Sequence, residues 1–308
     1  MKILIPGIVA LLCAPALANP ATEKSKVEVR PSAAPFKQLA IENPLGDVKV
    51  IGYDGSAVQI ETVKHAPDDD TLDRLRVALV PENDGTVRIA TSVDPAKELK
   101  PVGGGAVRID IVIHAPRSAR IDAATAAGKL EIENLDAGAE LDSTSGQITV
   151  TNVSGELMTH SISGAMSLSQ VFGAVDAATI SSNVDLDSIT GDKLVASAHK
   201  GSIAGRRVRS RDIELTTTDG RISLESEVAL HGHWVVSSLR GDISIQLRRA
   251  NNAVRIRARG GKVDLGQPAN LIERTAGWTV ATLGRPSDPS ASVELQSKYG
   301  IVSLAVIQ

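Results

Sequence analysis

The chain contains a single cysteine and few aromatic residues. Of its 308 residues only Cys13 is a cysteine, and the aromatic residues are two Trp, two Tyr and two Phe, or 2% of the chain. One cysteine excludes disulfides within the chain and thiolate metal sites of several cysteines. The scarcity of aromatic rings argues against base-stacking platforms, so we expect no nucleic acid partner.

The chain also lacks an apolar run long enough to span a membrane. Its first eighteen residues instead have the pattern of a secretory signal, with an apolar stretch at 3–12 and the small-x-small site Ala16-Leu17-Ala18. We expect cleavage after Ala18 and a periplasmic or extracellular (cell-surface) product with no transmembrane span. Leu12 precedes Cys13 where a lipoprotein signal would have a small residue, so lipidation is the less favoured alternative.

What the sequence does contain is glycine followed by alternating apolar residues, with a fixed period of 18 between about residues 128 and 198. The apolar columns are Leu130, Ile148, Met166, Val184, then Ile132, Val150, Leu168, Leu186, then Leu135, Val153, Val171, Ile189. Ser161, Thr179 and Ser197 form a polar column. A fixed period of this length is typical of a solenoid, and strict alternation is typical of strands with one buried face.

These columns predict an all-β fold, a single-stranded right-handed parallel β-helix (β-solenoid) of about 18–20 residues per coil. The inward positions Leu130, Ile132, Leu135, Ala139 and Thr144 are unevenly spaced, which argues against a left-handed hexapeptide helix. The usual handedness of strand–crossover–strand units favours the right-handed coil. In the next coils, Ile162 and Ile180 occupy the column of Thr144, so we expect both to be buried.

Along the chain we expect four segments. Residues 1–18 are the signal peptide and residues 19–35 a disordered linker. Residues 36–118 are expected to form an irregular N-terminal β region that caps the solenoid, because an open end would invite edge-to-edge pairing. Residues 119–308 contain the solenoid repeats, with a loop excursion near 267–290 and a closing strand pair after it.

The repeat resembles that of a known family. Gly128-Lys-Leu-Glu-Ile, Ser143-Thr-Ser-Gly146-Gln-Ile-Thr-Val and Ser161-Ile-Ser-Gly164-Ala-Met-Ser-Leu are similar to the "t-x-s-G-x-i-x-l" repeat of a bacterial family of β-strand-repeat envelope proteins named "putative adhesins". The resemblance covers about residues 38–308. It implies an exported, non-enzymatic β-solenoid, with adhesion assigned by analogy and no catalytic residues to carry over.

Charge is distributed unevenly between the coils. Residues 120–192 contain eleven Asp and Glu against two Lys and Arg, whereas residues 200–262 contain thirteen Lys and Arg against six Asp and Glu. Two arginine trios alternate with other residues, which places each trio on one outward face: Arg207, Arg209, Arg211 and Arg255, Arg257, Arg259. Such faces are either solvated surface or a site for an anionic ligand, with anionic lipid or polysaccharide as the candidates.

Other chemistry-bearing groups are isolated. His231 and His233 share a strand face but have no third metal ligand nearby, and Asp185 and Asp187 lack the repeated glycine-rich context of a calcium-binding β-roll. We therefore predict no metal and no cofactor. Outward carboxylates such as Glu131 and Glu133 keep open the alternative of a polysaccharide-active enzyme.

Together these observations predict an exported, non-catalytic β-solenoid that acts as an adhesion or envelope-scaffold surface, with an envelope or surface component as its partner. Two alternatives from other classes stay open. One is a polysaccharide-active β-helix enzyme, and the other is a self-assembling structural envelope protein.

Overall fold

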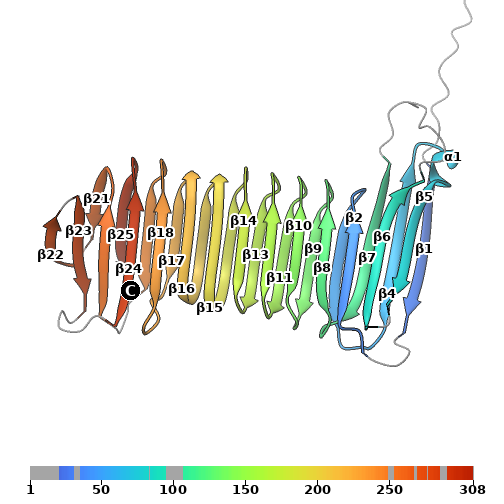
Figure 1. The fold of residues 1–308 in the computed structure, drawn as a ribbon, viewed down its shortest axis with the longest axis horizontal. Coiled ribbons are helices and arrows are strands. Elements are labelled where there is room, and N and C mark those ends of the chain that lie inside the picture. The colour runs from blue at the N-terminus through green and yellow to red at the C-terminus, as the bar shows by residue number, and fades with distance from the viewer. Residues whose placement is uncertain are drawn as a thin grey trace, which may run out of the picture.

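The computed structural model describes residues 21–30, 35–82, 84–94, 107–248, 253–266, 269–275, 277–284 and 290–307. Within these ranges it has 25 strands and one short helix, α1 (Asp69–Leu72). The strands stack along one axis into an elongated body, with α1 and β1 at one end and β22 at the other (Figure 1). The predicted signal peptide and its predicted cleavage site at Ala18 lie outside the described residues.

The strands form two facing sheets, which we call sheet I and sheet II. In stacking order, sheet I contains β5 (Leu75–Pro81), β6 (Thr86–Val93), β2 (Gln38–Asn43), β8 (Arg120–Thr125), β10 (Ala139–Ser143), β12 (Leu157–Ser161), β14 (Val175–Thr179), the second halves of β15 (Val184–Lys200) and β16 (Ile203–Asp219), β18 (His233–Ser238), β24 (Ala291–Ser297), β20 (Val254–Arg259), β23 (Trp278–Leu283) and β22 (Asn270–Thr275).

Sheet II contains β1 (Ala21–Val29), β4 (Val58–Ala66), β7 (Arg108–Pro116), β3 (Val48–Tyr53), β9 (Leu130–Leu135), β11 (Ile148–Ser154), β13 (Met166–Phe172), the first halves of β15 and β16, β17 (Ile222–Ser226), β19 (Ile243–Arg248), β25 (Ile301–Ile307) and β21 (Lys262–Leu265). Each coil therefore contributes one strand to each sheet, and β15 and β16 pass through both.

The register confirms the repeat predicted from the sequence. In sheet I, Ile121, Ala139, Leu157 and Val175 are paired partners on successive parallel strands, 18 residues apart. The step then grows, because Val175 pairs with Leu194, Leu194 with Ile213 and Ile213 with Trp234. The chain is thus an all-β solenoid whose coils lengthen toward the C-terminus.

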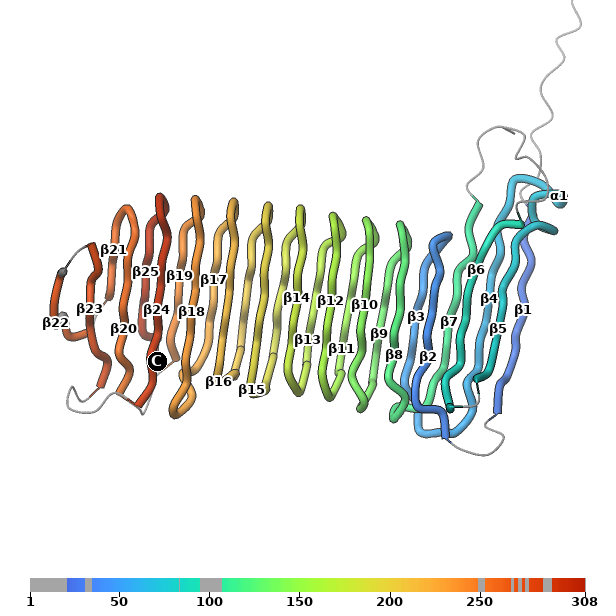
Figure 2. Tube along the Cα trace, in the orientation of Figure 1, coloured from blue at the N-terminus to red at the C-terminus, as the bar shows by residue number. Residues whose placement is uncertain are grey.

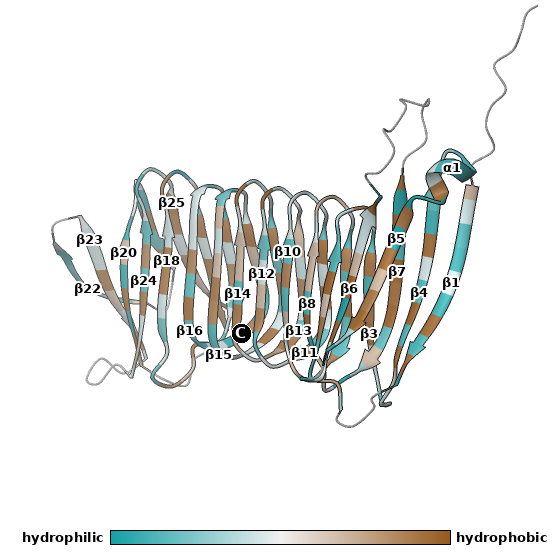
Figure 3. Cartoon of the chain, turned by 45° about the vertical axis from the view of Figure 1, so that its right-hand side comes forward, coloured by the Kyte–Doolittle hydropathy of each residue, from teal (hydrophilic) through white to brown (hydrophobic). Residues whose placement is uncertain are grey.

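The core lies between the two sheets as ladders of aliphatic side chains. Leu130, Ile148, Met166 and Val184 are partners in sheet II and each is at most 1% exposed. The alternation of buried apolar and outward polar residues is visible as bands along the strands (Figure 3). Narrow coils accept branched aliphatic side chains of this size, and Trp234 is the largest fully buried residue among those described.

Ile162 and Ile180, which we expected to be buried, are 51% and 50% exposed. The inward column lies one residue earlier, at Ser143, Ser161 and Thr179. The Ser161 hydroxyl is turned inward, where it accepts a hydrogen bond from the Gly164 amide at 2.7 Å. The next residue must then point outward at the turn, so the expectation for this column was wrong by one position.

The glycines that open the sheet II strands stack directly on one another. A Cβ added to Gly146 would overlap the carbonyl oxygen of Gly128, and one added to Gly164 would overlap that of Gly146. The same holds for Gly220 and Gly241 in the later coils. At these glycines the neighbouring coils come too close for a side chain, which explains why glycine recurs in the column, whereas Ser182 takes the position between Gly164 and Gly201.

At both ends the order of strands in space departs from their order in the chain (Figure 2). The first coil, β2 and β3, pairs in parallel with β8 and β9, so it belongs to the solenoid rather than to an irregular cap. The last strands, β24 and β25, lie between β18–β19 and β20–β21. The outermost strands of both ends include antiparallel pairs: β1 with β4, β5 with β6, and β22 with β23.

Two expected loop segments contain regular structure. Residues 21–29, part of the predicted disordered linker, form β1, which pairs over its whole length with β4. The predicted loop excursion near 267–290 contains the hairpin of β22 and β23. Both segments add strands to a sheet edge, where backbone hydrogen bonds are available whatever the side chains are. This explains why the side-chain pattern gave no signal for them.

Candidate anion-binding corner

Each regular coil bends near the end of its sheet II strand at a residue with a left-handed backbone. Asn134, Asn152, Gln170, Ser188 and Arg207 have φ between 52° and 61°. This conformation costs about 1–2 kcal/mol for a residue other than glycine. Side-chain hydrogen bonds between neighbouring coils offset the cost: Asn152 Nδ2 donates to Asn134 Oδ1 at 2.7 Å, and Arg207 Nε donates to Ser188 Oγ at 3.0 Å.

Arg207 begins the first arginine trio, which follows β16 around the bend from sheet II to sheet I. Arg207, Arg209 and Arg211 are exposed, while Val208 and Ser210 between them are fully buried. The predicted outward placement of this trio is therefore correct. We call these three residues the arginine corner.

A groove of about 220 Å³ lies at the arginine corner, and we call it the corner groove. It forms where the register of β16 against β17 shifts between Gly205 and Val208, so the next coil leaves the corner open. Its lining residues are Phe172, Ser188, Thr190, Arg207, Val208, Arg209, Ser226, Glu227 and Arg248. Arg211 does not line it.

The cations of the corner groove differ in how firmly they are held. Arg207 pairs with Asp187, and Arg248 Nε donates to Glu225 Oε1 at 2.8 Å. Arg209 lies 3.6 Å from the Glu227 carboxylate and donates no hydrogen bond within the described ranges. One guanidinium in the groove thus has its donors available, while the other two are oriented by neighbouring carboxylates.

The second trio, Arg255, Arg257 and Arg259, lies elsewhere, on β20 in the outer face of sheet I; we call it the outer trio. All three side chains are exposed. Arg257 pairs with Glu294 at 3.2 Å and lies 4.7 Å from the centre of the Trp278 ring. Asp212, next to Arg211, is linked by strand pairing through His233 and Ser292 to Arg255, so the outer trio lies three strands away in sheet I and does not line the corner groove. The sequence could not show this, because spacing places residues on a face of a strand but does not place strands relative to one another.

The outer face of the earlier coils is acidic. Asp122 lies in the same row as Glu140 and near Asp142, and its pKa is raised by burial and by these two carboxylates. In the later coils, Arg240 pairs with Asp219 and lowers the pKa of that carboxyl through hydrogen bonding. Aspartates in the two halves of the solenoid thus have shifts of opposite direction.

The candidate catalytic and metal-binding groups have other partners. Lys49 Nζ lies 3.4 Å from Glu131 and 2.7 Å from Glu133, so one ammonium holds both carboxylates. His233 Nδ1 lies 2.8 Å from the Ser292 hydroxyl. In the part of the chain that the structure describes, no three His, Asp, Glu or Cys residues come together as a metal site, and no helix is long and apolar enough to cross a membrane.

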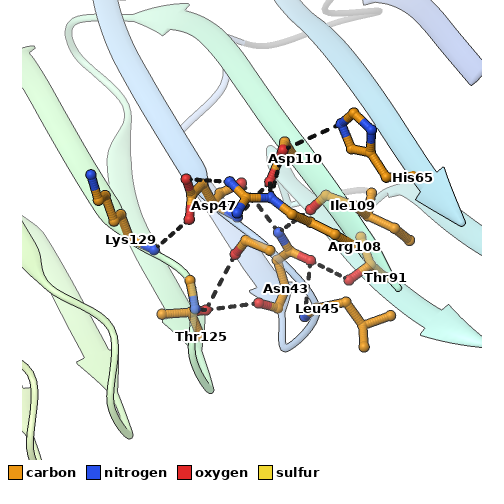
Figure 4. Close-up of polar contacts among 12 residues, drawn as sticks. Asn43, Leu45, Asp47, His65, Thr91, Arg108, Ile109, Asp110, Thr125 and Lys129 are labelled. Atoms are coloured by element: carbon orange, nitrogen blue, oxygen red, sulfur yellow. Dashed lines mark hydrogen bonds and ion pairs between the residues drawn. The ribbon is translucent and has the colours of Figure 1, made fainter. Parts of the chain in front are cut away.

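Asn43 is a buried polar residue whose role the sequence analysis missed (Figure 4). Its side chain donates to the Ile109 carbonyl at 2.8 Å and accepts from the Thr91 hydroxyl at 2.6 Å, while its own carbonyl accepts from Thr125 at 2.9 Å. Arg108 bridges Asp47 and Asp110 beside it. The network joins β2, β6, β7 and β8, and its role is to fasten the first coil.

These features define the class as a two-sheet β-solenoid whose outer faces differ in charge along its length. The chain belongs to the Toastrack DUF4097 family, whose model matches residues 36–264. Among curated proteins, none matches this chain.

Two solved structures show the same fold. A "putative lipid binding protein" from Parabacteroides distasonis is 12% identical, with a TM-score of 0.54 over 92% of this chain and 96% of that one. A "putative adhesin" from Parabacteroides merdae is 11% identical, with a TM-score of 0.51 over 92% of this chain and 95% of that one. At such identity the likeness extends to the fold alone.

Proposed function

We propose that this protein is an exported, non-catalytic β-solenoid that serves as an adhesion or envelope-scaffold surface and binds anionic material through the arginine corner. The observation that carries the proposal is the corner groove, where Arg209 has its hydrogen-bond donors available. Lys49 pairs with both Glu131 and Glu133, which favours a binding role over general acid–base catalysis by these carboxylates. We also infer a right-handed coil from the general preference of parallel crossovers.

The two structural neighbours support the choice of ligands to test. One is called a "putative adhesin", which agrees with a surface role, and the other a "putative lipid binding protein". Guanidinium groups bind the carboxylate, sulfate and phosphate groups of anionic polymers and lipid headgroups in the same forked geometry. The proposal therefore names an anionic polysaccharide or lipid surface as partner.

Export is tested by the intact mass of the protein isolated from its native cell envelope. A chain that begins at residue 19 is expected, because the small-x-small site ends at Ala18. A product that retains Met1, or one that carries a lipid at Cys13, would contradict this part of the proposal.

Binding is tested with the triple variant in which Arg207, Arg209 and Arg211 become Gln. Wild type should bind an acidic polysaccharide or anionic vesicles at about 0.1 M salt and lose most binding at about 1 M, where the Debye length falls to about 3 Å. The triple variant should bind weakly at both. The matched control replaces Arg255, Arg257 and Arg259 with Gln, which removes the same charge from residues that do not line the corner groove. Equal losses in the two variants would show that net charge alone matters.

A further inference from the structure

We propose that the corner groove is a carbohydrate site for a short stretch of an acidic sugar chain, with one sugar ring stacked on Phe172 and its anionic group held by Arg209. This inference rests on the proposed function for the charge of the ligand. It adds the location, the ring-stacking platform and the residues that discriminate between ligands.

Phe172 is the first reason to assign a sugar. The side chain is 51% exposed, in a chain with only two Phe residues. Its partner on the next coil is Thr190, and the partner of Thr190 on the coil after that is Arg209. An aromatic face, a hydroxyl and a guanidinium therefore lie side by side, about 4.8 Å apart from strand to strand. Aromatic faces pack well on the apolar C–H face of a ring, while the hydroxyl and guanidinium serve its polar edge.

Arg209 is the second reason to assign an acidic sugar. A sugar ring stacked on Phe172 lies two strands from the Arg209 guanidinium. The Arg209 side chain is 66% exposed, and within the described part of the chain its one ion pair is with Glu227, at 3.6 Å. A planar guanidinium binds a carboxylate or sulfate through two parallel hydrogen bonds. An acidic sugar supplies such a group at the edge of its ring.

The shape and lining of the corner groove favour an elongated polar ligand over a lipid chain. The lining runs from β13 to β19, which is four strand steps or about 19 Å at the usual strand spacing. Ser188 and Thr190 contribute hydroxyl groups along it, whereas Ser226 is buried and its hydroxyl donates to the Val208 carbonyl at 2.7 Å. Only Phe172 and Val208 are apolar, which is too little apolar surface for an acyl chain.

Glu227 sets a condition on the ligand. Its carboxylate lines the groove beside Arg209 and has the same sign of charge as the proposed ligand. Bound acidic sugar must displace Glu227 from Arg209 or lie against it, so Glu227 weakens binding. Replacing Glu227 with Gln should therefore tighten binding, a result that a merely structural ion pair does not predict.

The experiment is calorimetric titration of the full mature chain with a galacturonate tetrasaccharide, a sulfated heparin tetrasaccharide and neutral maltotetraose at about 0.1 M salt. One or both acidic probes should bind, and which of them binds distinguishes a carboxylate from a sulfate ligand. Maltotetraose should not bind. Phe172→Ala should weaken binding about fivefold and Phe172→Tyr should preserve it, in line with the strength of aromatic contacts. Arg209→Gln should weaken it about tenfold or more, and Glu227→Gln should strengthen it.

Arg221→Gln is the matched control, because Arg221 is exposed, pairs with Asp242 and does not line the groove. It should leave affinity unchanged. If acidic polymers bind wild type and are lost in the corner triple variant, but Phe172→Ala binds the tetrasaccharides as well as wild type, the sugar site is overturned and the proposed function stands. Equal binding of maltotetraose also overturns the site. If no acidic probe or polymer binds, both proposals fail together.

Discussion

The acidic coils of residues 120–192 and the basic coils of residues 200–262 share one interior and differ outside. Their inward ladders are the same kind of aliphatic column, and the strands pair across the boundary without interruption at β15 and β16. Their outward faces carry opposite charge. The comparison shows that stacking constrains only the inward positions, so the outward positions are available for function.

The two halves also differ in regularity. The steps between partners in the acidic coils are 18 residues, and they rise to 19 and 21 in the basic coils. The corner groove lies where the coil between β16 and β18 is longest and the register shifts. An expanded coil cannot cover its neighbour fully, so the irregular half acquires a concave site at this corner, whereas a groove of the regular half lies at the turns of Ile162 and Ile180.

The largest expected effect tests the shared interior. Val150 in the regular half and Val236 in the expanded half are both fully buried. Replacing either with Asp should cost about 3–5 kcal/mol of unfolding free energy, because each change buries an unpaired charge. Urea unfolding measures both.

Thr149→Asp and Ile162→Asp are the controls for this prediction, since both positions lie outside the aliphatic ladder. Each should cost under about 1 kcal/mol. A large loss for Ile162→Asp would mean that this turn is buried in solution, contrary to the exposure of its side chain.

The next effect concerns the glycine column. Gly146→Ala should cost about 3 kcal/mol, because the added methyl meets the backbone of Gly128 and one of the two coils must shift. Gly205→Ala, where the nearest atom is the Leu224 Cδ1 methyl at 2.7 Å, should cost about 1 kcal/mol because a side chain can shift. Thermal unfolding of both variants gives the comparison, and equal costs would contradict a backbone limit.

A smaller effect tests which serine and threonine side chains form the inward polar column. Ser161→Ala should cost about 1–2 kcal/mol, because it removes the acceptor of the Gly164 amide inside the coil. Ser197→Ala should cost under about 0.5 kcal/mol, because Ala198 takes the inward position in that coil and Ser197 faces outward. A cost at Ser197 as large as that at Ser161 would restore the column predicted from the sequence.

The smallest expected effect is a difference between the two halves in how an aspartate makes stability depend on pH. The folded-state pKa of Asp122 is raised, so its ionised form destabilises the native state at neutral pH and this penalty disappears as the pH falls through the folded pKa. Asp122→Asn should raise the unfolding midpoint slightly at pH 7 and leave it unchanged near pH 3.

Asp219, in the basic half, has a pKa shift in the opposite direction to that of Asp122. Its folded-state pKa is lowered by Arg240, so its contribution to stability is present above the unfolded pKa and is lost as the pH falls through the folded pKa. Asp219→Asn should lower the midpoint slightly at pH 7 and have no effect at low pH. A change of the unfolding midpoint in the same direction for both variants at pH 7 would refute the electrostatic contrast between the two halves.

Much of the fold was predictable because a solenoid repeats its local geometry. The columns of Leu130, Ile132 and Leu135 are buried and paired as expected, since alternation and period are both local properties. The prediction that Ile162 is buried was wrong, because a turn offers two adjacent positions and apolar character does not decide which one faces inward. The hydroxyl of Ser161 decided it by hydrogen bonding to the turn.

By itself the sequence determined the all-β class, the 18-residue step and the outward placement of both arginine trios, because these follow from side-chain spacing within a strand. Only the tertiary structure decided that the outer trio lies outside the corner groove, that β24 and β25 insert before β20 and β21, and that Phe172 meets Arg209 across Thr190. These depend on which strands become neighbours, and backbone pairing across coils sets that without leaving a pattern in the side chains.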